Sequence, residues 1–422
     1  MIAVLFLLLI ASLISYKKTV LFSAVVFMFM NNLSSGIEGV KLYYAIVLAQ
    51  IVLFYLLGYY KKKKERYPLL ILVPTLIAGI CYFISSYVGT MHQYGKNAVN
   101  IMVWFYYPYI VWHVMSSSKE VIYYGKILIS FFFVVTGYAV LEFIIGQNLY
   151  SQWADAAGII AGELGGTEAV ERFGLLRCNS ILPFCSALGM DASIVFTSLA
   201  ILITKGKKFF SFEKLLIFLL PLCVLLCGTR SQFIVFTLCF LGLLCTKEYR
   251  KSGYMKVLIA IGLAGVVAFS SVFVEIINSI LHSDTSSVEG SNTDMRLGQF
   301  DIAAYYWLQS PLFGHGRSFT WEVAIPNNPA LMGAESIVFT QLIDHGIAGL
   351  ISFYLIGMCL TFWCYRYSRP LAMIPIAFIA GKTMSTVVGV EYNIPIILCI
   401  FVVKALILYK DSQYEVEYRS YK

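Results

Sequence analysis

Apolar residues along this chain are grouped into long runs, separated by polar connections that are mostly short. A transmembrane helix needs about 20 consecutive apolar residues, within a range of about 17–25. We therefore expect an all-α, polytopic integral membrane protein with about 12–14 transmembrane helices. The candidate segments are Met1–Ile14, Thr19–Leu33, Lys41–Tyr60, Pro68–Tyr87, Ala98–Met115, Val121–Gly146, Ser186–Thr204, Lys214–Gly228, Ser231–Thr246, Tyr254–Leu281, Glu335–Tyr365, Pro370–Val388 and Tyr392–Tyr409.

Two long polar stretches interrupt this pattern, Gln147–Pro183 and Ser283–Gly333. Within the second, apolar residues recur at roughly helical spacing between Asp294 and Leu308, which predicts an amphipathic helix. Thr293 or Asn292 is its expected N-cap. An amphipathic helix rich in aromatic residues is suited to a membrane surface. Because both stretches are loops between apolar segments, we expect residues 1–422 to form a single polytopic domain.

The distribution of lysine predicts the orientation in the membrane. No lysine occurs between Lys126 and Lys205 or between Lys256 and Lys382, and these two windows contain both long polar stretches. The short connections elsewhere are basic, and cytoplasmic loops are the ones that carry an excess of lysine and arginine. The two long loops are therefore predicted to face outward, with the C-terminal segment Lys410–Lys422 in the cytoplasm.

Composition agrees with a membrane protein. The chain is 59% hydrophobic and 13% charged, whereas soluble domains have about 25% charged residues. The net charge of +8 does not indicate nucleic-acid binding, because the positive residues stand at helix ends; topology and attraction to anionic headgroups explain it. We interpret Met1–Ile14 as a first span rather than a cleaved signal peptide. Of ten cysteines, only Cys178 and Cys185 fall in an outer segment, which leaves a disulfide between them open.

Arginine is the basic residue of the predicted outer side. Arg230 stands at a tight turn between two apolar segments, and a lone arginine there is also compatible with an interfacial anchor. A set of arginines without lysine indicates a different role, because guanidinium groups bind phosphate oxygens in two-pronged fashion. A lipid-linked diphosphate at the outer leaflet is the expected ligand. The outer arginines are Arg172, Arg177, Arg230, Arg296 and Arg317.

Further ionisable residues follow the second long loop. Glu335 stands at a predicted helix start, either as an acid that complements the helix dipole or as a general base for a sugar hydroxyl. Asp344 and His345 lie about two to three turns further along that helix. Lys382 lies inside another predicted span, where it has Glu391 as a candidate partner. Ionisable groups at such depth are functional or paired, so a hydrogen-bonded His345 and a structural Lys382–Glu391 pair remain alternatives.

No nucleotide-binding loop and no metal-ligand spacing occurs in the sequence. We therefore expect no cofactor and no metal, with the energy for any transfer coming from an activated substrate.

Several ordered motifs resemble the O-antigen polymerase and ligase superfamily, over about residues 172–350. In that family an arginine precedes an aromatic-rich helix and a Pro-Leu-Phe-Gly-x-Gly turn, and a Glu-Ser or His-Asn pair precedes the returning helix. The matching segments are Asp294-Met295-Arg296-Leu297, Trp307, Ser310-Pro311-Leu312-Phe313-Gly314-His315-Gly316, Glu335-Ser336, Gln341–Leu350, Gly228-Thr229-Arg230-Ser231 and Arg172–Gly189.

The resemblance implies a glycosyltransferase of the cytoplasmic (inner) membrane, acting on its outer, periplasmic side. The ligase branch has a histidine where this chain has Glu335, which favours the Wzy-type polymerase branch. The implied reaction joins undecaprenyl-diphosphate-linked oligosaccharide repeat units into O-antigen, as in lipopolysaccharide biosynthesis, or into capsular polysaccharide. Glu335 would be the base, the outer arginines and His315 would bind the substrate, and Asp344, His345 and Lys382 are secondary candidates.

Two other functions remain open at this stage. A ligase would transfer finished glycan to lipid A core, and a transporter or flippase would move a lipid-linked sugar across the membrane. Transporters need alternating access and often show internal repeats, whereas the polar residues here gather at one predicted face. Expected partners are the lipid-linked oligosaccharide and membrane lipid, with a chain-length regulator protein as a further candidate and no nucleic acid.

Overall fold

The computed structural model describes residues 2–35, 41–62, 65–159, 171–172, 175–210, 212–268, 293–331, 333–385 and 390–409. The predictions for residues 283–292 and for the segment 410–422 lie outside these ranges. Within them the chain is helical, apart from a small antiparallel hairpin of β1 (Glu171–Arg172) and β2 (Leu175–Leu176) and an isolated bridge between Ser34 and Lys41.

The described helices confirm an all-α, multi-pass membrane protein. Four are long and apolar enough to cross a bilayer: α5 (Leu69–Val88), α8 (Ser118–Ile145), α10 (Cys185–Thr204) and α18 (Ile337–Tyr365). Shorter apolar helices are α1 (Ile2–Ile14), α4 (Leu42–Leu56), α12 (Arg230–Leu244), α14 (Gly253–Ala268) and α20 (Asn393–Leu408). The others are α2 (Tyr16–Ser23), α3 (Val26–Phe29), η1 (Tyr59–Lys62), α6 (Tyr94–Ile101), η2 (Met102–Tyr106), α7 (Tyr107–Val114), α9 (Leu149–Ala156), α11 (Glu213–Leu226), α13 (Lys247–Arg250), α16 (Thr293–Gln309), η3 (Thr320–Ala324), α17 (Ile325–Asn327), η4 (Pro329–Leu331), η5 (Arg369–Ala372) and α19 (Met373–Met384).

Two predicted spans are not continuous helices; the run Glu335–Tyr365 is interrupted at Gly346 in α18. The run Thr19–Leu33 is divided into the end of α2 and the short helix α3. Leu21, Val25 and Met28 in this stretch are fully buried. Irregular backbone at membrane depth is tolerated where protein rather than lipid surrounds it. The burial of this stretch therefore explains how the chain can break the helix here.

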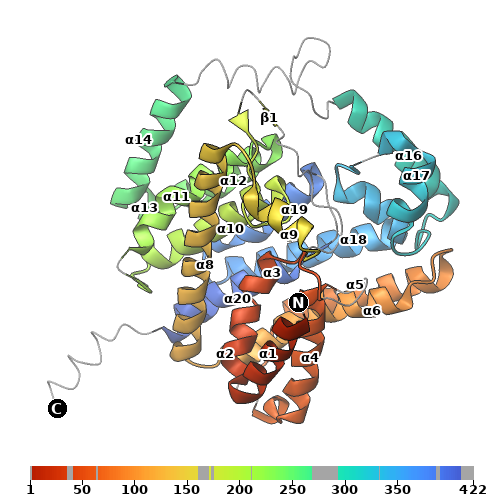
Figure 1. The fold of residues 1–422 in the computed structure, drawn as a ribbon, viewed down its shortest axis with the longest axis horizontal. Coiled ribbons are helices and arrows are strands. Elements are labelled where there is room, and N and C mark those ends of the chain that lie inside the picture. Colours follow the sequence, from red (N-terminus) through yellow and green to blue (C-terminus); the bar gives the residue numbers. More distant parts are fainter. Residues whose placement is uncertain are drawn as a thin grey trace.

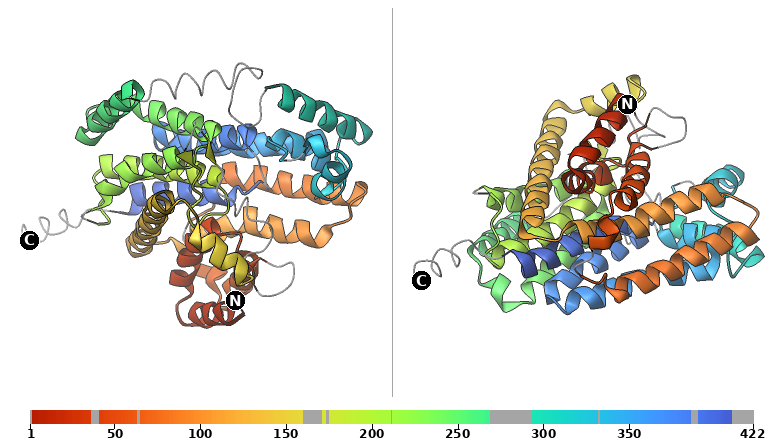
Figure 2. Two further views of the ribbon diagram at one scale, coloured as in Figure 1. Left: turned by 45° about the horizontal axis from the view of Figure 1, so that its top comes forward. Right: turned by 90° about the horizontal axis from the view of Figure 1, so that it is seen from below.

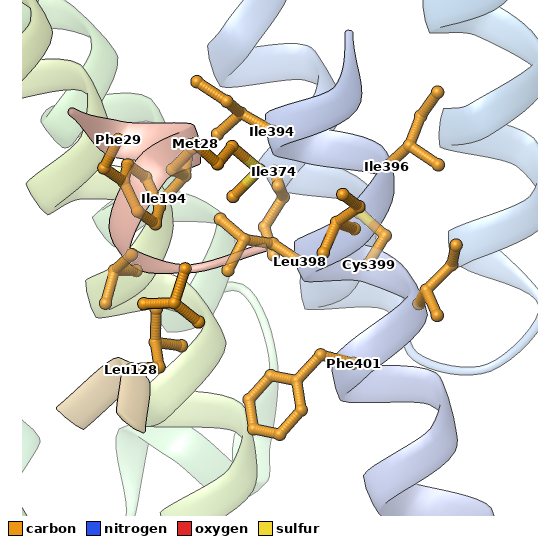
Figure 3. Packing of buried hydrophobic residues seen from close by; sticks show 14 of the residues in the cluster. Met28, Phe29, Leu128, Ile194, Ile374, Ile394, Ile396, Leu398, Cys399 and Phe401 are labelled. Atoms are coloured by element: carbon orange, nitrogen blue, oxygen red, sulfur yellow. The ribbon is translucent and has the colours of Figure 1, made fainter. Parts of the chain in front are cut away.

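The centre of the protein is α20, which contacts α7, α8, α10 and α19. Its side chains Ile396, Leu398 and Phe401 are fully buried, and Figure 3 shows them among apolar residues from several other helices. A helix that is apolar on all sides must be surrounded by other protein elements or by lipid. Here the surroundings are protein, so α20 is a core helix.

Helix α16 and the segments after it form a separate small core against α18. Figures 1 and 2 show α16 and α17 together at one end of α18. The buried side chains of this core include Ala303, Tyr306, Phe319 and Phe339. The outer side of α16 is also apolar, with exposed residues that include Leu297, Tyr305 and Leu308. The helix predicted between Asp294 and Leu308 is thus present, and its exposed side is suited to contact with lipid.

Candidate active site

Arg230 is the first residue of α12 and follows a tight turn at Gly228. Gly228 has φ +58°, and a Cβ added to it would lie 2.8 Å from Cγ of Arg177. Glycine is therefore required twice, by the left-handed backbone and by the close approach of Arg177. This turn brings two of the predicted outer arginines, distant in sequence, to the same place.

Arg177 follows β2 and lies against the turn. Its Nη2 donates to Oγ1 of Thr229 at 3.2 Å and to Sγ of Cys185 at 2.9 Å. All ten cysteines are free thiols. The disulfide left open between Cys178 and Cys185 is therefore absent, and Cys185 instead accepts a hydrogen bond from the guanidinium. Arg172 lies on β1, paired with Leu175 across the hairpin.

The loop that carries Arg177 is fixed by Glu142 near the C-terminal end of α8. The backbone N–H groups of Asn179 and Ser180 donate to its two carboxylate oxygens, at 3.3 and 2.7 Å. Asn148 adds two bonds of 2.8 Å, to the Asn179 side chain and to the Ser180 carbonyl. A buried carboxylate satisfied by two backbone donors anchors this loop.

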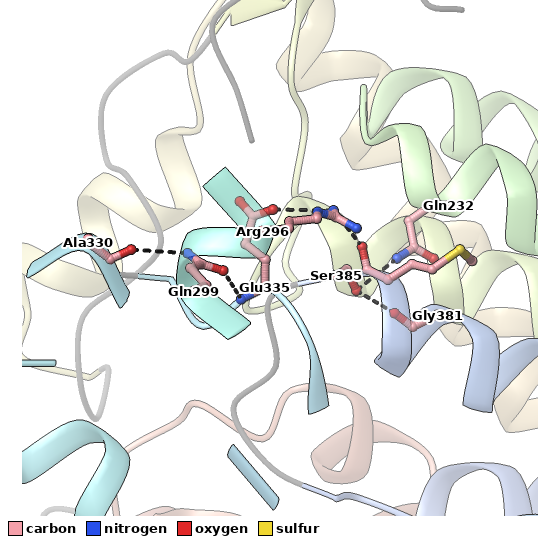
Figure 4. A network of polar contacts seen from close by, with 8 residues as sticks. Gln232, Arg296, Gln299, Ala330, Glu335, Gly381 and Ser385 are labelled. Carbon is pink, nitrogen blue, oxygen red and sulfur yellow. Dashed lines mark hydrogen bonds and ion pairs between the residues drawn. The ribbon is translucent and has the colours of Figure 1, made fainter. Parts of the chain in front are cut away.

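Arg296, on α16, joins three segments of the chain. Its Nη2 lies 3.3 Å from Oε2 of Glu335 and donates to the Met384 carbonyl at 3.0 Å. Gln299, one turn further along α16, accepts from the Glu335 backbone N–H at 3.3 Å. Figure 4 shows these contacts, with Ser385 on the side of α19 next to Arg296. Arg296 therefore connects α16, the start of α18 and the end of α19.

Glu335 lies just before α18 rather than within it. Ser336 is the N-cap of that helix, and its side chain accepts from the Val338 N–H. The preceding turn has positive φ at Gly333 (+87°) and Ala334 (+32°). Arg296 contacts Oε2 of Glu335. Among the described residues no group donates to the other oxygen, Oε1. The carboxylate thus has one oriented oxygen and one oxygen available to a substrate.

Arg230 belongs to the same group of charges. It is half-buried, and its guanidinium interacts electrostatically with Arg296, Arg177 and Glu335. Arg230 is thus within electrostatic range of Arg177 and of the Arg296–Glu335 pair, so the group of three guanidinium groups and one carboxylate carries an excess of positive charge. Like charges held together repel one another, and an anion bound between them relieves that repulsion. The arrangement is suited to a doubly charged diphosphate.

Arg317 and His315 lie elsewhere, at the joint between the loop after α16 and helix α18. Arg317 stacks over the Trp104 ring, with 5.2 Å from Cζ to the ring centre. With the Asn100 amide turned so that its oxygen faces the guanidinium, Nε of Arg317 donates to it at 3.1 Å. His315 is buried and its Nε2 donates to the Tyr306 carbonyl at 2.8 Å.

Asp344 and His345 belong to this second group and are held by protein partners. Oδ1 of Asp344 accepts from both the backbone N–H and Oγ1 of Thr320, each at 2.7 Å. Nδ1 of His345 lies 2.9 Å from Oγ of Ser85, which itself donates to the Asp344 carbonyl. A hydroxyl has one proton, so His345 is the donor. The His345 ring also stacks on Tyr82 at 4.3 Å.

The second group surrounds a break in α18. Gly346 has φ +64° and ψ −164°, which interrupts the helix. The N–H groups of Ile347 and Ala348 donate to the carbonyls of Pro311 and Leu312, at 2.9 and 3.1 Å. The carbonyls at positions 343 and 344 accept instead from the N–H groups at 315 and 316, at 3.0 and 2.9 Å. The Pro-Leu-Phe-Gly turn thus satisfies the backbone groups that the break frees.

Lys382 and Glu391 form an ion pair of 2.9 Å, and Glu391 also accepts from Asn31 at 2.9 Å. This is the pairing expected as an alternative for Lys382. The residues that the sequence did not indicate are Gln299 and the Met384 carbonyl, because a backbone acceptor and an amide carry no motif. Among the described residues no group of histidine, cysteine and acidic side chains is arranged to hold a metal.

Comparison with known proteins identifies the domain that contains this site. No curated protein matches the chain. Residues 215–354 match the family model described as O-antigen ligase. The matched region begins in α11, includes Arg230, Arg296 and Glu335, and ends within α18 beyond its break at Gly346. This match, over about a third of the chain, supports the resemblance to the O-antigen polymerase and ligase superfamily.

Proposed function

We propose that this protein polymerises oligosaccharide repeat units linked to undecaprenyl diphosphate, at the outer face of the cytoplasmic membrane. The family supports a polymerase or ligase that acts on a lipid-linked glycan. The observation that carries the proposal of a lipid-diphosphate substrate is the arginine group, in which Arg230 interacts electrostatically with Arg177, Arg296 and Glu335 and Arg296 is paired with Glu335. In the ligase branch the family resemblance leads us to expect histidine at the Glu335 position.

The chemistry follows from the charges. A lipid diphosphate ester has two ionised phosphate oxygens, and the arginines bind and neutralise them. A hydroxyl of the acceptor sugar attacks the anomeric carbon of the donor glycan. The bond from that carbon to the phosphate oxygen breaks, and the diphosphate leaves with the electron pair. Stabilising charge that develops on a leaving group is a large contribution to catalysis.

Glu335 accepts the proton of the attacking hydroxyl in this proposal. Arg296 orients Oε2 through the ion pair, and Oε1 is the atom that would face the acceptor. The competing role for Glu335 is to complement the dipole of α18. That role is worth only about 0.3–1 kcal/mol, and the N-cap itself is already provided by Ser336.

The test is polymer formation from purified lipid-linked repeat units by Glu335→Gln. Glutamine preserves size and hydrogen bonding but cannot accept the proton, and loss of a general base costs about 10²–10⁴-fold in rate. The matched control is Glu322→Gln, an exposed glutamate in the same polypeptide segment that pairs with Lys96. We expect the control to retain wild-type activity. Activity of Glu335→Gln within about threefold of wild type would exclude the base role.

Ligation is the second candidate, because the matching family model is described as O-antigen ligase. The two reactions differ in the acceptor. Supplied with lipid-linked repeat units alone, a polymerase forms a ladder of longer chains on the lipid diphosphate. A ligase leaves these units unchanged and transfers glycan only when lipid A core is added. Transfer solely in the second mixture would replace polymerisation by ligation as the function.

A further inference from the structure

A cavity of about 480 Å³ lies among the N-terminal helices. It is formed by the turn between α1 and α2, the end of α4 and the start of α8, and its walls include Lys17, Lys18, Lys119, Glu120, Leu57 and Tyr59. Figures 1 and 2 show that α1, α2 and α4 are remote from α16, which carries Arg296. The cavity is therefore separate from the candidate active site.

Two lysines of this cavity, Lys18 and Lys119, form no ion pair with a described acidic residue. Lys17 is paired with Glu120 at 2.8 Å and bonded to Ser116 at 2.9 Å, so these two charges offset each other. Lys18 and Lys119 are exposed, and no acidic side chain among the described residues pairs with either. The cavity wall consequently carries a surplus of positive charge, which favours an anion.

The start of α8 adds a third lysine to the same wall. Helix α8 has 28 residues and begins at Ser118, with Ser117 as its N-cap. The Ser117 side chain makes no capping bond and donates to Glu120 instead. The Glu120 carboxylate also accepts from its own backbone N–H, so it already occupies the donors of this terminus. Lys119 is the second residue of the same turn, and its side chain adds a cation to the cavity wall.

The remainder of the cavity is apolar and opens onto an apolar surface. Leu13 and Ile14 at the end of α1 are 60% and 81% exposed, and Leu57 after α4 is 39% exposed. Tyr59 stacks on Tyr16 with ring centres 4.7 Å apart. Exposed leucine and isoleucine beside a basic cavity suit a ligand with a charged head and a hydrocarbon tail, and a fully water-soluble anion would leave them uncovered.

We propose that this cavity binds the phosphate headgroup of an anionic phospholipid in the cytoplasmic leaflet, with its acyl chains along α1 and α4. Lys17 and Lys18 belong to a basic connection predicted to face the cytoplasm, where anionic lipids attract such residues. Lys18 and Lys119 bind the phosphate. The site is independent of the proposed polymerisation, since none of its residues belongs to the arginine group.

The test uses the full chain purified in an uncharged detergent and titrated with dioctanoyl phosphatidylglycerol in a thermophoresis assay. Dioctanoyl phosphatidylcholine has the same tails without net charge, and sn-glycerol 3-phosphate has the phosphate without tails. We expect tight binding of phosphatidylglycerol only. Each basic residue near a membrane surface contributes a factor of about five in affinity, so Lys18→Gln with Lys119→Gln should weaken binding about 25-fold.

The matched control is Lys251→Gln with Lys256→Gln, which removes two exposed lysines from another basic connection. We expect this variant to bind like wild type, and Lys18→Arg with Lys119→Arg to retain most of the affinity. Equal weakening by the control pair would overturn the site in favour of diffuse attraction by net charge. Equal binding of phosphatidylcholine would reduce it to apolar adsorption, and equal binding of glycerol phosphate would identify a soluble anion instead.

Discussion

Replacing Arg296 by lysine keeps the positive charge and removes the two-pronged donor, so it tests whether the guanidinium geometry matters. In the structure Nη2 of Arg296 reaches both Oε2 of Glu335, at 3.3 Å, and the Met384 carbonyl, at 3.0 Å. The other nitrogens remain for the substrate phosphate. An ammonium group presents a single centre and cannot hold these partners and a phosphate together.

The effect on folding should be small. The side chains of Arg296 and Glu335 are 38% and 21% exposed, and ion pairs open to solvent contribute about 0.2–1 kcal/mol. For a chain of more than about 150 residues this corresponds to a Tm change of about 4 °C or less. The effect on catalysis should be larger, because a hydrogen bond to a charged group contributes about 1.5–3 kcal/mol, or about 10–150-fold in kcat/KM.

The assay measures polymer formed from lipid-linked repeat units by purified Arg296→Lys and Arg296→Ala, together with their Tm values. Arg250→Lys on the exposed surface of α13 is the matched control. We expect both Arg296 variants to fold and to lose at least about tenfold in kcat/KM, with the control unchanged. Wild-type activity in Arg296→Lys would refute the need for the guanidinium geometry, and wild-type activity in Arg296→Ala as well would leave Arg296 with a structural role only.

Three further predictions concern the scaffold and the topology. Gly346→Ala puts a Cβ 2.6 Å from the Leu312 backbone in the Pro-Leu-Phe-Gly turn and should prevent stable folding. Gly298→Ala is the control and should be tolerated, because open space surrounds it. Equal thermal stability of the two variants would disprove the close packing of this turn against the break in α18. Asp344→Ala removes three accepted hydrogen bonds and should lower Tm along with activity, and an inactive variant of unchanged Tm would indicate a chemical role. In a cysteine-depleted chain, Gln152→Cys should react with an impermeant maleimide in whole cells and Lys251→Cys only after lysis; the reverse pattern would invert the topology.

Helix positions follow from the sequence with few exceptions, because a run of apolar side chains must be covered by lipid or protein whatever its neighbours are. The run predicted at Val121–Gly146 corresponds to α8 (Ser118–Ile145), and the run at Ser186–Thr204 corresponds to α10 (Cys185–Thr204). Thr19–Leu33 and the run Glu335–Tyr365, which breaks at Gly346, are the exceptions, since hydropathy does not distinguish burial in protein from burial in lipid. The sequence also indicated the outer arginines, because the long loops contain arginine but no lysine, and Glu335, because it stands at a predicted helix start.

Tertiary contacts decide which of the predicted site residues lie together and which lie apart. Arg177, Arg230 and Arg296 share one place with Glu335, whereas Arg317 is stacked on Trp104 beside the inserted turn. All of these arginines have the same charge and similar local surroundings in the sequence. Their separation depends on long-range packing that no local pattern encodes.

The break at Gly346 is the clearest case of this division. The sequence contains its glycines and the Pro-Leu-Phe-Gly turn, and these residues permit positive φ and close backbone approach. Whether a helix continues or breaks depends on where its backbone groups find hydrogen bonds. Those partners are the carbonyls of Pro311 and Leu312 and the N–H groups of His315 and Gly316, on a segment that precedes the helix in sequence and meets it only in the folded chain. Composition and hydropathy determine that the chain is a bundle of membrane helices, and the fold alone decides which polar groups meet within it.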